Sequence, residues 1–256
     1  MPFPPTFFHT FLESCEQHRD NTAFIYRVGE DEFKVTYEKF FEDVLLLARA
    51  FKDNKVRKGD KVFILSDNRY SWIVTDLALQ ALGAVSVPRG TDTPPSEIEF
   101  IVNHSDSEFL VIETDSLYNE CQTLIKSLKL KAVFIVAGSE KHSWFDKATS
   151  YSKLLENRSI EPRDIEWFKG LADKITPEDL LTIIYTSGTT GTPKGHAESL
   201  QHHAQRAHPA TAYSPGRRRR MGLHPADLAH LRTHGGVYPR RQGQLSGLLL
   251  HPHLRR

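Results

Sequence analysis

Hydrophobic positions in the first part of the chain recur at helical spacing in two segments and form short apolar runs in two others. Apolar side chains in 37–51 return every three or four residues, which predicts an amphipathic helix with Thr36 as its cap. The same spacing predicts an earlier helix over 7–20. Apolar runs at 23–27 and 32–35 predict two strands that turn back on one another. The aromatic stripe of the longer helix is interpreted as core and not as a ligand site.

From residue 59 onward, short apolar runs alternate with segments of helical spacing. The runs predict strands at 61–65, 84–87, 109–112, 132–136 and 180–184. The helical spacing predicts helices at 70–82, 96–103 and 117–128, with a short helix capped by 176–179. Pro88 is expected to stop the second strand, and Ser96 with Glu99 to form a capping box. Strands alternating with helices imply βαβ crossovers, so the fold class is α/β with a largely parallel sheet covered on both faces.

A glycine-rich stretch, 185–195, follows the last predicted strand directly. Its glycines allow tight turns and close approach to a ligand, its hydroxyls can donate hydrogen bonds, and Lys194 adds a positive charge. Backbone N–H groups in such turns form an anion-binding concavity, which predicts a polyphosphate site. A solvated linker is the alternative, but a linker needs no apolar strand before it, and the residue order excludes a Walker A loop. The candidate phosphate-binding residues are Thr186, Ser187, Gly188, Thr189, Thr190, Gly191 and Lys194.

The eleven residues of this stretch, Tyr-Thr-Ser-Gly-Thr-Thr-Gly-Thr-Pro-Lys-Gly, resemble the signature loop of the AMP-forming adenylate-forming enzymes, the acyl-CoA synthetase and ligase superfamily. The resemblance implies the N-terminal part of that fold, with the loop closing over the β- and γ-phosphates of ATP. It also implies magnesium as a cofactor, and a fatty acid and CoA as substrates. The family's catalytic and metal-binding residues lie beyond Gly195, so none is assigned, and Lys194 is not the family's catalytic lysine.

A second region is similar to bacterial long-chain fatty acyl-CoA synthetases. It contains the run 87–92, the pair His104-Ser105 and the run 111–113. These residues are better interpreted as core and helix contacts than as chemistry, because a lone histidine such as His104 is usually structural. The resemblance implies a long-chain fatty acid–CoA ligase. Another carboxylate–CoA ligase of the superfamily remains an alternative, because the signature loop does not distinguish the two.

Charge divides the chain at Gly195. Residues 1–195 carry 23 basic and 30 acidic side chains, whereas 196–256 carry ten arginines, two acids and nine of the 13 histidines. After Gly195 both helical and strand periodicity disappear. We therefore expect 1–195 to be the N-terminal part of an AMP-binding domain and 196–256 to be a disordered tail. The tail could also be a nucleic-acid-binding arm of a non-catalytic protein, because a cationic run attracts phosphates whatever its sequence.

The tail also has a genetic interpretation. When each residue is back-translated with a suitable codon and the bases are read one position later, residues 221–243 can give WAFILPIWHIFERMVEYIRVGKG. Residues 195–198 and 201–206 give further segments in that same shifted frame. All three resemble the continuation that the family shows. We interpret 196–256 as a frameshifted translation, which disfavours a nucleic-acid arm and implies a truncated chain that is inactive alone.

Cysteine usage and hydropathy indicate a cytoplasmic location. Cys15 and Cys121 have no metal or redox spacing and are expected to be reduced core thiols. The N-terminal residues show no basic and apolar signal pattern, and no apolar run is long enough to cross a bilayer. Contact with a membrane surface is left open by the sequence.

Overall fold

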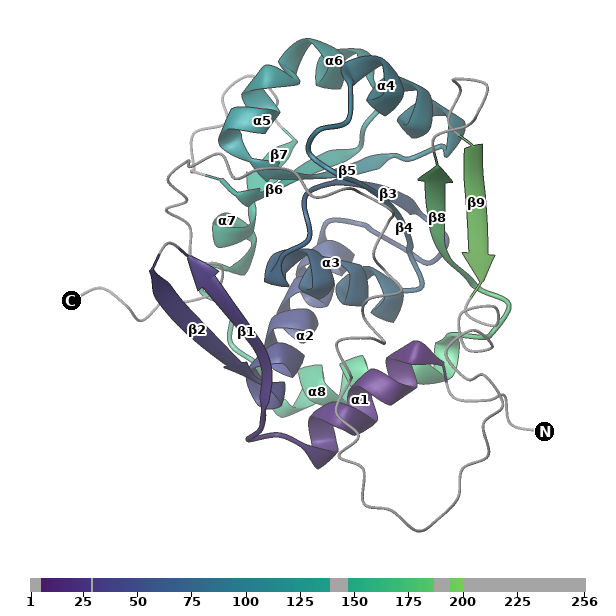
Figure 1. Cartoon of the computed structure of the whole chain (residues 1–256). Helices are drawn as coiled ribbons and strands as arrows, with labels where there is room; N and C mark the ends of the chain where they lie inside the picture. Colours follow the sequence, from purple (N-terminus) through teal and green to yellow (C-terminus); the bar gives the residue numbers. More distant parts are fainter. Residues whose placement is uncertain (1–5, 29, 139–146, 187–193, 200–256) are drawn as a thin grey trace.

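The computed structural model describes residues 6–28, 30–138, 147–186 and 194–199 of the 256-residue chain. In these ranges a seven-stranded sheet has helices on both faces, and a two-stranded hairpin lies apart from it (Figure 1). This confirms the α/β class. The predicted tail from residue 200 onward lies outside the described residues.

The large sheet has the strand order β7-β6-β5-β3-β4-β8-β9. Each neighbouring pair is parallel except β8 and β9, which are antiparallel, so the prediction of a largely parallel sheet is confirmed. The strands are β3 (Lys61–Leu65), β4 (Val85–Arg89), β5 (Phe109–Thr114), β6 (Ala132–Ala137), β7 (Ala148–Ser150), β8 (Leu180–Thr186) and β9 (Lys194–Ser199).

Strand β4 continues through Pro88, so the prediction that this proline stops the strand is wrong. The Ser66 amide donates to the Arg89 carbonyl oxygen, which shows that Arg89 points its backbone groups toward β3. Backbone direction alternates along a strand, so the missing N–H of Pro88 points toward β8. The backbone pairing of β4 with β8 is confined to Ser86 and Thr182, and the proline therefore removes no bond of that pairing.

Alternate residues of the central strand β3 enter two different cores. Val62 and Ile64 pack into one cluster, whereas Phe63 and Leu65 pack into the other. The second cluster includes side chains of α4, α5 and α6, and the first includes side chains of the other helices. Figure 1 shows α4, α5 and α6 on one face of the sheet and α2 and α3 on the other. The first face carries α1 (Phe7–Gln17), α2 (Tyr37–Asp53), α3 (Tyr70–Ala81), α7 (Tyr151–Leu155) and α8 (Pro162–Lys169); the second carries α4 (Pro95–His104), α5 (Asp115–Glu120) and α6 (Gln122–Ser127).

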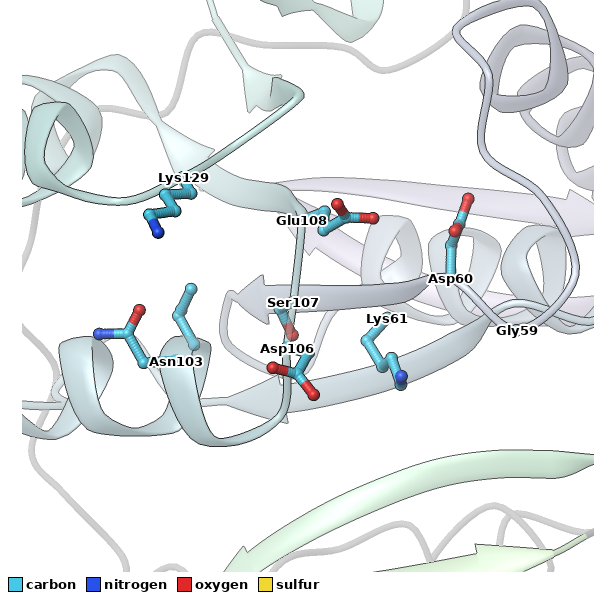
Figure 2. A pocket seen from close by; sticks show the side chains of 9 residues that line it. Gly59, Asp60, Lys61, Asn103, Asp106, Ser107, Glu108 and Lys129 are labelled. Carbon is cyan, nitrogen blue, oxygen red and sulfur yellow. The ribbon is translucent and has the colours of Figure 1, made fainter.

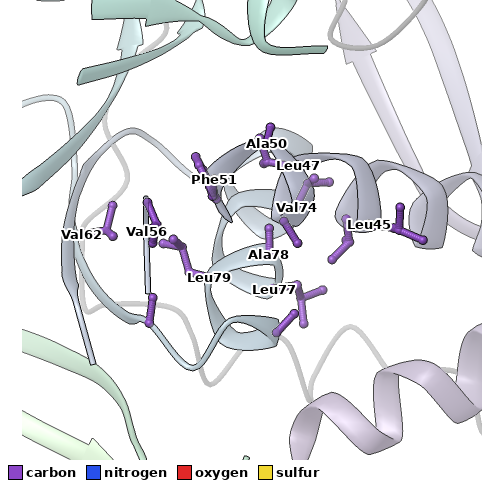
Figure 3. Close-up of a cluster of buried hydrophobic side chains, with 14 of the residues drawn as sticks. Leu45, Leu47, Ala50, Phe51, Val56, Val62, Val74, Leu77, Ala78 and Leu79 are labelled. Carbon is purple, nitrogen blue, oxygen red and sulfur yellow. The ribbon is translucent and has the colours of Figure 1, made fainter. Parts of the chain in front are cut away.

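Helices α2 and α3 pack together on the first face of the sheet. Thr36 caps α2 by accepting a hydrogen bond from the Lys39 amide at 3.1 Å, as the sequence predicts. Ala50 of α2 and Ala78 of α3 are both fully buried, and both are labelled in Figure 3. Almost every residue of α3 is buried because α3 lies between the sheet and α2.

Three predicted helical features differ in the structure. Helix α4 begins at Pro95 after Pro94 and has no capping box, because Ser96 already lies inside the helix. The predicted helix 117–128 is two short helices, α5 and α6, which meet at Cys121. Residues 176–179 form a turn and not a helix. The Asp179 carboxylate accepts from the Thr176 amide at 2.7 Å and so caps the turn itself.

Two further segments complete the described fold: the hairpin of β1 and β2, and the polar connection of residues 147–179 that leads to β8. Strands β1 (Thr22–Val28) and β2 (Asp31–Thr36) pair antiparallel, as predicted. In the polar connection, Tyr151 and Phe168 are buried core residues. Trp144 and Phe145 lie outside the described residues.

Strand β9 includes 196–199, where the sequence predicts no periodic structure. Backbone pairing with β8 forms it, and such pairing needs no apolar pattern. No helix in the described ranges has the length and apolar composition that crossing a bilayer requires.

Candidate functional site

The candidate phosphate loop connects β8 to β9. The two strands pair up to the position where Thr186 lies opposite Lys194, and both of these side chains are exposed. Five of the seven predicted site residues lie outside the described residues: Ser187, Gly188, Thr189, Thr190 and Gly191. The structure therefore describes the two predicted residues at the ends of the loop and brings them together across the hairpin.

The loop leaves the sheet at the carboxyl ends of the parallel strands. Strands β3, β4, β5 and β8 run in the same direction, so Leu65, Arg89, Thr114 and Thr186 all lie toward one edge. In Figure 1, β8 and β9 stand beside β4 at the side of the sheet. Open α/β sheets bind ligands at this edge.

Tyr185 is the last buried residue before the loop. Its side chain is 2% exposed, and its hydroxyl lies 2.7 Å from Nδ1 of His104. Burial raises the pKa of the Tyr185 phenol, with a smaller contribution from Asp106, so the hydroxyl keeps its proton near neutral pH. A Cβ added at Gly195 would lie 3.0 Å from the Tyr185 ring, so the glycine permits the two strands to pair closely at this point.

Arg89 connects the same residue to helix α4. Its Nη1 donates to the Tyr185 carbonyl oxygen at 3.0 Å, and its Nη2 forms an ion pair with Glu97 in the first turn of α4. Arg89 thus adds a side-chain hydrogen bond between β4 and β8 to the backbone pairing of Ser86 with Thr182. In the sequence, Arg89 stands out only as part of the run 87–92, and this contact could not be predicted from it.

A network at the carboxyl edge ties the loop after β3 to β5. Glu113, at 6% exposure, accepts from the Ser66 hydroxyl at 3.0 Å and the Asp67 amide at 2.8 Å. Its other oxygen pairs with Arg69 at 2.5 Å. The chain leaves β3 toward α3 on one face and leaves β5 toward α5 on the other, so Glu113 bridges the point where the two connections separate.

Asp67 extends this network to the loop after β4. Its Oδ1 accepts from the Thr91 amide at 3.0 Å and from the Thr91 hydroxyl at 2.9 Å. The sequence reasoning missed Ser66, Asp67 and Arg69, although polar residues directly after an apolar strand were a signal that could have found them. The network thus connects the loops after β3 and β4 with the end of β5.

A cleft of about 410 Å³ lies at the opposite edge of the sheet. Residues at or just before the starts of β3, β5 and β6 line it, together with the end of α4. Figure 2 shows that carboxylates and lysines are mixed along this lining. Because it lies at the amino ends of the strands, it is separate from the loop. Its charged lining residues are Asp60, Lys61, Asp106, Glu108 and Lys129.

His104 has the environment of a structural residue. Its ring stacks on Phe100 with centroids 5.2 Å apart and meets the Tyr185 ring edge-on at 5.8 Å. These contacts support the structural interpretation of this histidine. Among the residues that the structure describes, no three carboxylate, imidazole or thiol groups gather to hold a metal ion.

Both cysteines are buried free thiols, as predicted. Burial raises the pKa of Cys15 to about 12 and also raises that of Cys121. Neither thiol is therefore suited to act as a nucleophile at neutral pH.

Comparison with known proteins shows relatives among ligases that activate acids. A chloroplastic long-chain-fatty-acid–acyl-carrier-protein ligase of Arabidopsis thaliana is 28% identical, over 71% of this chain and 26% of its own length. A long-chain-fatty-acid–CoA ligase of Mycobacterium tuberculosis is 32% identical, over 62% and 25% respectively. A 4-hydroxybutyrate–CoA ligase of Metallosphaera sedula is 28% identical, over 75% and 33%. The chain spans a quarter to a third of the length of these relatives.

Solved structures share the fold. The anthranilate CoA ligase AuaEII, solved with anthranoyl-AMP, superposes with a TM-score of 0.65 at 19% identity, over 81% of this chain and 37% of that one. The N-terminal subdomain of NpsA from Klebsiella oxytoca gives 0.57 at 22% identity, over 80% and 44%. The family model described as AMP-binding enzyme matches residues 11–239. The match covers most of the chain, which therefore belongs to the AMP-binding enzyme family.

Proposed function

We propose that the segment 186–194 binds the β- and γ-phosphates of magnesium-bound ATP. The observation that carries the proposal is the pairing of Thr186 with Lys194 at the carboxyl edge of the parallel sheet. This pairing brings a hydroxyl and an ammonium group together at the two ends of a loop rich in glycine and hydroxyl residues. Hydrogen bonds from charged donors to phosphate are among the stronger interactions available to a protein.

The proposed role of this segment is to position and neutralise the triphosphate. Lys194 places a positive charge beside the phosphates, and Thr186 supplies a hydroxyl donor. Magnesium would arrive bound to the triphosphate and would neutralise part of its charge. The Glu113 network joins the loop after β3 to β5 at the same carboxyl edge of the sheet.

The proposed reaction is that of an AMP-forming acid–thiol ligase. A carboxylate oxygen attacks the α-phosphorus of ATP, the bond to the β-phosphate oxygen breaks, and pyrophosphate leaves. The sulfur of CoA then attacks the acyl carbonyl carbon, and AMP leaves. The names of the relatives support this class, since they include both CoA ligases and an acyl-carrier-protein ligase.

We propose a long-chain fatty acid as the acid substrate. The support comes from the long-chain ligases among the relatives, including the M. tuberculosis protein at 32% identity. The alternative acid substrate is a shorter acid, because the relatives also include a 4-hydroxybutyrate–CoA ligase of M. sedula. Because this chain spans about a quarter of the first relatives' length, we expect these 256 residues to bind the triphosphate without completing the reaction.

Substitution of Lys194 tests the phosphate site. Lys194→Met in the 256-residue chain should weaken binding of magnesium-bound ATP about 10-fold or more, because it removes a charged donor. Isothermal titration calorimetry measures the dissociation constant.

Lys129→Met is the matched control. Lys129 is an exposed lysine that lines the cleft at the opposite edge, so this variant should bind like wild type. Equal binding by wild type and Lys194→Met, or equal loss in both variants, would contradict the proposed site.

A further inference from the structure

Tyr185 contacts both ends of the glycine-rich loop. It lies one residue before Thr186 at the start of the loop, and its ring lies against Gly195 just after Lys194 at the end. It is also the paired partner of Gly195 across the hairpin. Any shift of the Tyr185 ring or carbonyl therefore changes the positions at which the loop begins and ends.

Helix α4 is linked to Tyr185 in two ways, directly through His104 and indirectly through Arg89 of β4. At its carboxyl end, Nδ1 of His104 forms the 2.7 Å hydrogen bond with the Tyr185 hydroxyl, and Phe100 supports the imidazole from one turn earlier. At its amino end, Glu97 pairs with Arg89, which donates to the Tyr185 carbonyl oxygen at 3.0 Å. One helix thus fixes the side chain and the backbone of the same residue.

We propose that His104 and Arg89 are positioning residues which, by holding Tyr185, fix both ends of the glycine-rich loop. Neither touches the proposed triphosphate site through a contact that the structure describes; each acts through Tyr185. A loop whose ends are fixed loses less conformational freedom when a ligand binds, and so binds more tightly. This consequence for ligand affinity rests on the proposed function, whereas the positioning itself does not.

Hydrogen–deuterium exchange of the ligand-free chain tests the positioning directly. Tyr185→Phe keeps the ring against Gly195 and removes only the hydroxyl, and His104→Leu removes the nitrogen partner. Both should speed backbone exchange in peptides covering 186–199 about 5-fold or more, with β5 and β6 unchanged. His104→Asn should restore wild-type exchange, because an asparagine amide can place either an acceptor or a donor near the position of Nδ1.

Tyr151→Phe is the matched control for loss of a buried phenol hydroxyl. Its hydroxyl bonds to Thr75 at 2.8 Å on the opposite face of the sheet, away from the loop. This variant should leave exchange in 186–199 unchanged. The inference is overturned if Tyr185→Phe and His104→Leu leave that exchange at wild-type rates, if His104→Asn fails to restore it, or if Tyr151→Phe speeds it equally.

Binding of magnesium-bound tripolyphosphate to the same variants separates the two proposals. We expect Tyr185→Phe and His104→Leu to weaken it about 5-fold relative to wild type and to His104→Asn. If wild type does not bind this probe, the proposed phosphate site fails, while the exchange measurement still decides whether His104 positions the loop. If wild type binds and the variants bind equally, the positioning inference fails and the phosphate site stands.

Discussion

Asp76 is a carboxylate enclosed between α3 and β4. It is 4% exposed, and its Oδ2 accepts from Nε2 of Gln80 at 2.6 Å. Burial raises its pKa to about 6, while hydrogen bonds with Ser86 and Gln80 partly oppose the rise. The folded chain therefore holds this proton more tightly than the unfolded chain does, and folding stability falls as the pH rises from about 4 through 6.

Replacing Asp76 by asparagine should remove this pH dependence. Asp76→Asn should match wild type near pH 4 and exceed its free energy of unfolding by about 2–3 kcal/mol at pH 8, because no charge is then buried. Urea unfolding at a series of pH values measures the difference.

Asp179→Asn supplies a control of opposite sign. Partial burial opposes ionisation of Asp179, but its bonds with Lys58 and Thr176 lower its pKa overall. Its ionised form therefore stabilises the fold above the unfolded pKa, so Asp179→Asn should lower stability at pH 8. A wild type and an Asp76→Asn variant with parallel pH profiles would contradict the account of Asp76.

At the scale of elements, Phe51 connects α2 to the sheet and to α7. The residue is fully buried, and its ring lies 5.0 Å from Phe134 of β6 and 6.1 Å from Tyr151, centroid to centroid. Figure 3 shows it beside Ala50 and Leu47, on the stripe that the helical spacing predicts. A cavity at this point would therefore be surrounded by three different elements.

Truncation of Phe51 should strongly destabilise the chain. Phe51→Ala should lower the free energy of unfolding by about 3–5 kcal/mol, because apolar contact is lost and the packed neighbours collapse only partly. Denaturant titration followed by circular dichroism measures it. Phe51→Leu retains most of the volume and should cost clearly less, so equal costs for the two variants would contradict the packing argument.

Elements with a long or continuous apolar pattern could be predicted from the sequence. Burial of apolar side chains determines the helix with the stripe from Tyr37 to Phe51 and the strands β3 and β6. The spacing of apolar residues in the sequence shows this burial directly. The continuation of β4 through Pro88 could not be predicted, because it depends on which neighbouring strand each backbone group faces. The loop ends Thr186 and Lys194 were predicted as site residues. The contacts of the adjacent Tyr185 with Arg89 and His104 could not be predicted, because they depend on the tertiary arrangement of α4.

At the scale of the whole molecule, the seven-stranded sheet ends at one side in the hairpin β8–β9. The change of charge at Gly195 lies within β9, one residue after Lys194 at the end of the loop. The family match continues to residue 239 and so includes part of the segment that we interpret as frameshifted. The reading frame of this segment stays a prediction.

The encoding nucleotide sequence tests the frame. We expect a second frame to stay open from the codon for Gly195 through that for Gly243 and to encode the string beginning WAFILPIWHIF. Sequencing of both genomic DNA and transcript reads this directly. A stop codon in that frame within this stretch would contradict the frameshift and restore the arginine-rich tail as the native continuation.

The burial of both cysteines has a practical consequence for studying the loop. Neither Cys15 nor Cys121 offers an accessible thiolate, so the native chain is almost inert toward maleimide and methanethiosulfonate reagents. A cysteine introduced at the exposed position of Thr186 would be the one fast-reacting group. Spin labels or fluorophores could then be attached at the mouth of the hairpin without first removing any native sulfur.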